Sequence, residues 1–211
     1  MRATLSRLAR RALPLFTLGL FVLSGCLPTS ENPILVPGQP AVDERLLGMW
    51  FGPLEEDEDP VYLHFLPVDS GRDETHPGGM DILMVLQPDE PDGDTGWAVF
   101  YALSAQIAGQ SYLSIEFRID SGEDVVDSMR GYHLFRTQLN DDGTLTLLAA
   151  DEDRVEEIIE SGSLKGDLDE ATFLPEIRIT ASSAEWAAFL GSEQADTLFT
   201  KVMGPFRRAI P

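Results

Sequence analysis

The 211-residue sequence has one cysteine, three histidines and two lysines, and it contains no uninterrupted apolar segment of 20 residues. A lone cysteine cannot form an intramolecular disulfide, so Cys26 is a buried apolar residue, a reactive nucleophile, a metal ligand or a site of covalent modification. A helix that spans a bilayer needs about 20 apolar residues, and the apolar run over residues 13–23 is shorter than that. We therefore expect no retained transmembrane helix.

The neighbours of Cys26 favour covalent modification. The first eleven residues carry four arginines and no acid, the apolar run follows, and the small residues Ser24 and Gly25 precede the cysteine. This order is typical of a secretory signal peptide, here over residues 1–25.

Leu23-Ser24-Gly25-Cys26 resembles the lipobox of bacterial lipoproteins. The resemblance implies that the Cys26 thiol receives a diacylglycerol, that the peptide is cut before Cys26, and that the new amino group is acylated, for example with palmitate. Several acyl chains on one residue make a durable anchor, because each buried methylene contributes about 0.8 kcal/mol. Leu27 stands where an inner-membrane retention signal would have Asp, so the resemblance implies the outer membrane, with the domain in the periplasm or at the cell surface.

The charge balance excludes nucleic acid as a partner. Removal of residues 1–25 takes away four arginines and no acid, so the formal net charge changes from −21 to −25. Such a surface repels nucleic acid and anionic headgroups, which makes the lipid anchor the expected membrane contact. We interpret the acidic clusters as solvated loops; the alternative is calcium binding, although none of them matches an EF-hand loop. The clusters lie at 55–59, 89–94, 122–127, 151–157 and 167–170.

Several prolines and little periodicity in residues 26–44 predict a flexible tether, followed by a single acidic domain over residues 45–211. Within the domain, Leu113 and Ile115 belong to a clear period-two pattern that is typical of a half-buried strand. Similar short apolar runs between turn-forming residues predict strands at 46–52, 61–68, 80–87, 97–104 and 111–119.

The C-terminal half combines a hairpin with helices. Residues 132–150 contain two strand-like runs around Asn140-Asp141-Asp142-Gly143, a turn in which glycine can adopt a positive φ. A short amphipathic helix is predicted within 151–166 and a last strand at 173–180. The spacing of Ser182 and Glu185 is that of a capping box, which predicts the start of a second helix.

About eight strands in mainly antiparallel order, with short helices near the C-terminus, predict a mainly β, barrel-like domain, because a barrel has no exposed edges. A β-sandwich is the alternative. Gly48-Met49-Trp50 resembles the Gly-x-Trp of lipocalins, which implies that Trp50 plugs a closed barrel end. Lipocalins have one long helix after the eighth strand, whereas a helix is expected before the last strand here.

A broader resemblance covers residues 46–208. The order of YLHFLP, GYHLFR, DGTLTL, SGSLKG, ITASSAEWAAFL and PFRR is similar to that in a lipoprotein family of exported proteobacterial proteins whose function is unassigned. This resemblance implies one compact domain and carries no activity.

The residues that support chemistry are few, so we expect neither an enzyme nor a cofactor. His64, His76 and His133 stand apart, and the sequence has no HExxH or CxxC metal motif, no Gly-rich phosphate loop and no G-x-S-x-G elbow. We therefore expect no catalytic residue and no metal site. Lipidation at Cys26 is the one modification that the sequence predicts.

The expected role is non-catalytic: binding to an envelope protein or another accessory task in the envelope. The alternative is a lipocalin-like carrier of a small hydrophobic or anionic ligand, with aromatic walls and two guanidinium groups in a wide barrel. A barrel filled with apolar side chains would exclude the carrier, and the candidate ligand-binding residues would then lie on the outer side of the strands. These candidates are Tyr101, Tyr112, Arg118, Tyr132 and Arg136.

Overall fold

The structure is a computed structural model. The segment expected to be a signal peptide and Cys26 lie outside the residues that it describes, as do His76 and most of the acidic clusters at 89–94 and 122–127. The described residues are 27–56, 58–68, 78–87, 95–120, 123–124, 131–169 and 176–209.

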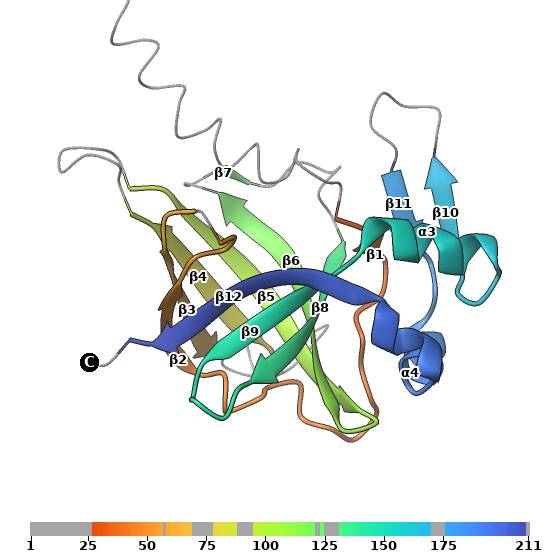
Figure 1. Cartoon of the computed structure of the whole chain (residues 1–211), viewed down its shortest axis with the longest axis horizontal. Helices are drawn as coiled ribbons and strands as arrows, with labels where there is room; N and C mark the ends of the chain where they lie inside the picture. Colours follow the sequence, from red (N-terminus) through yellow and green to blue (C-terminus); the bar gives the residue numbers. More distant parts are fainter. Residues whose placement is uncertain are drawn as a thin grey trace, which may run out of the picture.

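Eight antiparallel strands close into a barrel (Figure 1), which confirms the predicted fold class. Each strand pairs with its neighbour in the order β2, β3, β4, β5, β6, β8, β9 and β12, and β12 pairs back with β2. The strands are β2 (Gly48–Gly52), β3 (Val61–Pro67), β4 (Met80–Leu86), β5 (Trp97–Ile107), β6 (Gln110–Asp120), β8 (Tyr132–Leu139), β9 (Leu145–Ala150) and β12 (Phe199–Arg208).

The hairpin and both helices form where the sequence predicts them. Gly143 has a φ of 81° in the turn between β8 and β9, a value that glycine adopts without strain. Helix α3 (Glu152–Glu160) follows β9, and helix α4 (Ser183–Leu190) begins with the predicted capping box. Both helices lie between β9 and β12, so they precede the last barrel strand.

Four further strands are short, and the sequence predicted only one of them, within wider bounds. β1 (Thr29–Ser30), β10 (Gly166–Asp169) and β11 (Glu176–Ile179) extend the sheet beside the first residues of β8, and β7 (Glu123–Asp124) pairs with β6. β11 lies within the predicted last strand, but the last barrel strand is the longer β12.

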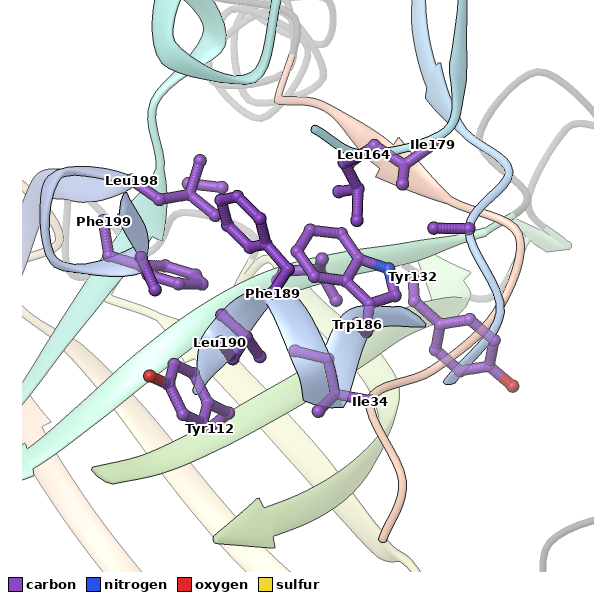
Figure 2. Packing of buried hydrophobic residues seen from close by; sticks show 14 of the residues in the cluster. Ile34, Tyr112, Tyr132, Leu164, Ile179, Trp186, Phe189, Leu190, Leu198 and Phe199 are labelled. Carbon is purple, nitrogen blue, oxygen red and sulfur yellow. The ribbon is translucent and has the colours of Figure 1, made fainter. Parts of the chain in front are cut away.

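The barrel wall separates two apolar clusters. The inner cluster receives side chains from all eight barrel strands, and its members include Trp50, Phe65, Met80, Phe135, Leu145 and Phe206. The outer cluster lies between the outer face of the wall and the helices (Figure 2), and its members include Ile34, Leu103, Tyr112, Trp186, Phe189 and Phe199. Strand β6 shows the division directly, because Leu113 belongs to the inner cluster and its neighbour Tyr112 to the outer one.

Residues 27–47 pack along the barrel as an extended segment, which we call the N-terminal strap. The described part of the expected tether, residues 27–44, is therefore part of the folded domain, and the tether prediction needs correction. β1 pairs with both β8 and β11, Ile34 is 1% exposed, and the Ile34 amide donates to Ser114 Oγ at 2.8 Å. Proline does not prevent this arrangement, because an extended strap needs few backbone donors.

The strap ends beneath Trp50. The Trp50 indole N–H donates to the Leu46 carbonyl at 2.7 Å, and the Arg208 guanidinium lies over the ring at 4.5 Å from its centroid. Arg208 also donates to the carbonyls of Arg45 and Leu47, which join the strap to the last strand. Trp50 therefore lies where the last residues of the strap, β2 and the end of β12 meet.

Candidate functional site

None of the five candidate ligand-binding residues lines the barrel interior. Tyr101, Tyr112 and Tyr132 belong to the outer cluster, and the two arginines occupy outward-facing positions of their strands. The inner face of the same strands carries Ala102, Leu113 and Phe135. These five side chains therefore do not line a pocket inside the barrel, and apolar side chains of the inner cluster occupy the inner face of these strands.

The candidates form two separate groups on the outer face. The Arg118 guanidinium stacks over the Tyr101 ring at 4.9 Å and pairs with Glu116 at 2.8 Å, with both charged side chains partly exposed. Tyr112 lies opposite Arg136 in the register and packs against Phe199, with ring centroids 5.5 Å apart. Burial raises the pKa of the Tyr112 hydroxyl, so it stays protonated near neutral pH.

Tyr132 is the first residue of β8 and lies opposite Ser30 of the strap. The Trp186 indole N–H donates to Ser30 Oγ at 3.0 Å, and the Ser30 hydroxyl donates to the Asn32 carbonyl at 2.7 Å. Tyr132, Trp186 and Ile34 all belong to the outer cluster, and Figure 2 shows the three side chains near one another. The surroundings of Tyr132 are therefore structural, because they join β8, the strap and α4.

Helix α4 holds the strap through polar contacts as well. Ser183 Oγ donates to the Pro33 carbonyl at 2.7 Å, and Asn32 Nδ2 donates to the Ala181 carbonyl at 3.2 Å. Glu185 completes the helix cap, and the Lys165 ammonium together with the Ser182 backbone and hydroxyl holds the pKa of this carboxyl low, at about 2. The helix start is therefore held in its charged, capped form across the neutral pH range.

A groove of about 910 Å³ lies between the middle of the strap and α4. Its lining is mostly apolar, with Leu35, Val36 and Ala41 from the strap, Leu103 from β5 and Ala187 from α4. The strap side is held by backbone and side-chain bonds to β5, including the Ser104 amide to the Ala41 carbonyl at 2.8 Å. Sequence reasoning missed this groove, because it depends on where the strap and the helix meet.

His133 lies at the barrel end opposite Trp50, beneath the first residues of the strap. It stands opposite Thr29 of β1, and its imidazole donates a hydrogen bond to the Pro28 carbonyl. Its Nδ1 atom is buried without a hydrogen-bond partner among the described residues, and Phe117 lies edge-on to the ring. Burial lowers the pKa of His133 to about 4.

The other residues that could take part in catalysis or bind a metal do not form a cluster in the described part of the chain. His64 lies in β3, opposite Met49 on one side and Leu83 on the other. Within the described ranges no three His, Cys, Asp or Glu side chains gather as metal ligands. The helices of these ranges are also too short and too polar to cross a membrane.

Comparisons with protein-family models, with curated protein sequences and with solved structures find no match for this chain.

The buried imidazole predicts a pH-dependent stability. The unfolded chain binds a proton on His133 with a pKa near 6.5 and the folded chain near 4, so protonation favours unfolding as the pH falls between these values. We expect this one group to remove about 3 kcal/mol of stability between pH 7 and pH 4. His133→Gln keeps a donor for Pro28 but cannot titrate.

Urea unfolding of both proteins from pH 7 to pH 4 measures the effect. The loss of unfolding free energy should be clearly smaller in the His133→Gln variant than in the parent. Equal losses in the two proteins would contradict the burial of a neutral imidazole.

Proposed function

We propose that this protein is a bacterial lipoprotein, cut before Cys26 and anchored in the outer membrane by acyl chains on that residue. In this proposal the barrel domain lies in the periplasm or at the cell surface and has a non-catalytic binding or accessory role in the envelope. The observation that best supports the anchor is the position of the motif Leu23–Cys26 directly before the strap. The first strand of the fold, β1, begins only three residues after the cysteine.

Removal of the signal peptide would leave the described fold complete. Every strand and helix that the structure describes lies after Cys26, and the strap makes its contacts with β5, β6, β8, β11 and α4 from Leu27 onward. The mature chain would then carry its anchor on the residue directly before the described strap.

The interior of the barrel supports a role without a bound small molecule. A carrier needs a cavity, whereas apolar side chains from all eight strands pack together inside this barrel. We therefore prefer the accessory role to the lipocalin-like carrier. The groove between the strap and α4 is the hollow at which contact with an envelope protein is best sought.

Replacement of Cys26 tests the anchor. Cys26→Ser removes the only thiol of the chain, so it should abolish both acylation and the cut before residue 26, and the uncut chain should differ in mass from the parent protein. Mass spectrometry of the purified protein and detergent phase partitioning measure both effects. A Cys26→Ser variant that stays in the membrane with the mass of the parent protein would disprove the proposal.

Replacement of the histidines tests the non-catalytic role. His64→Gln and His133→Gln should each complement a deletion strain at matched membrane abundance, because neither histidine lies in a sequence motif that supplies a nucleophile, an oxyanion hole or a metal site. A variant that folds, is acylated and accumulates normally but does not complement would assign chemistry or ligand contact to that histidine.

A further inference from the structure

The strap leaves almost no free chain between the proposed lipid and the barrel. Leu27 packs against the inner cluster, Pro28 is buried and accepts the hydrogen bond from His133, and Thr29 pairs with β8 and β11. Consecutive Cα atoms are about 3.8 Å apart, so a lipid on Cys26 would be attached within a few ångströms of a packed residue. The sequence predicted a tether of about twenty residues at this point, which would have allowed the domain to rotate freely.

The attachment point identifies one end of the barrel. We call it the anchored end: β2, β4, β6 and β9 finish there, and β3, β5, β8 and β12 begin there. β1 pairs with the first two residues of β8, beyond the end of β9, where the chain has already turned into α3. The opposite end carries the turns at 108–109 and 140–144, together with Trp50 and Arg208. Both ends are visible in Figure 1.

We propose that the anchored end faces the membrane and that the opposite end points away from it. This inference rests on the proposed acylation of Cys26. A strand of seven residues that is tilted by about 40° spans about 20 Å along the barrel axis, so the two ends would differ in distance from the lipid surface by about that length.

The charges at the anchored end determine the kind of lipid surface that fits. Exposed acids fill the turn between β2 and β3, among them Glu55, Glu56 and Glu58. Partial desolvation and, after it, the nearby negative charge of Glu55 raise the pKa of the exposed Glu58. Such a surface is repelled by anionic headgroups, so the anchored end fits a zwitterionic phospholipid surface.

Two matched labels test the orientation. Glu56→Cys lies in the turn at the anchored end and Asp141→Cys in the turn at the opposite end, and each replaces one exposed acid. In acylated protein the Cys26 thiol is blocked, so a thiol-specific spin label reacts only with the introduced cysteine. The proteins are reconstituted in phosphatidylcholine vesicles that contain a nickel-chelating lipid, whose headgroup enhances spin relaxation at short range.

The label at residue 56 should show a relaxation enhancement several-fold larger than the label at residue 141. A second variant carries twelve Gly and Ser residues between Cys26 and Leu27, a flexible insert with an average span of about 20 Å. This insert should keep the protein on the vesicles and remove most of the difference between the two labels.

Two results would overturn the inference, and they are distinguishable. Equal enhancement at both positions in protein of acylated mass would refute the orientation and leave the proposed lipoprotein function intact. Reaction of the spin label with Cys26 in the parent protein would mean that the thiol is free. That result would refute the acylation and the orientation together.

Discussion

Both faces of the barrel wall are apolar along β5, β6 and β8, and the rest of the chain is arranged to cover the outer one. Leu103, Tyr112 and Leu134 are each at most 3% exposed although they point away from the barrel interior. Exposure of one such side chain costs about 1.5–3 kcal/mol, which is a large part of the 5–15 kcal/mol that stabilises a typical domain. The helices and the strap are therefore needed for a stable fold.

The strap is the part of this cover that connects structure with the proposed function. It lies between α4 and the wall, where Ile34 meets the outer cluster and its amide binds Ser114. Its first residues cover His133 at one end of the barrel interior, and its last residues meet Trp50 and Arg208 at the other. A lipid at Cys26 would thus be joined to the strap, which contacts both the inner and the outer cluster.

Local sequence patterns were sufficient to predict the elements that depend only on neighbouring residues. The alternation along β6, the glycine of the turn at 140–144 and the capping box of α4 each depend on neighbouring residues, and each is present as predicted. Barrel closure followed from the number of strands and the cost of exposed edges.

The parts that sequence reasoning missed depend on distant residues. The prolines of the strap predict a free tether, because nothing in that segment indicates that α4, more than 140 residues later, packs over it. The alternation along a strand separates its side chains into two faces, but it does not show which face points into the barrel. The sequence therefore left open whether the tyrosines on β5, β6 and β8 face a cavity or the outside. The short strands β1, β10 and β11 are held by pairing with one another, so no single run of residues predicts them.

Hydrogen exchange at individual amides of the folded domain tests most directly whether the strap is part of the fold. The Glu31 amide donates to the Ile179 carbonyl, the Ile34 amide donates to Ser114 Oγ, and the Ser104 amide donates to the Ala41 carbonyl. The account predicts that the amides of Glu31 and Ile34 are protected as strongly as those of β6. Exchange of these two amides at the rate of an unstructured peptide, while the barrel amides stay protected, would contradict it.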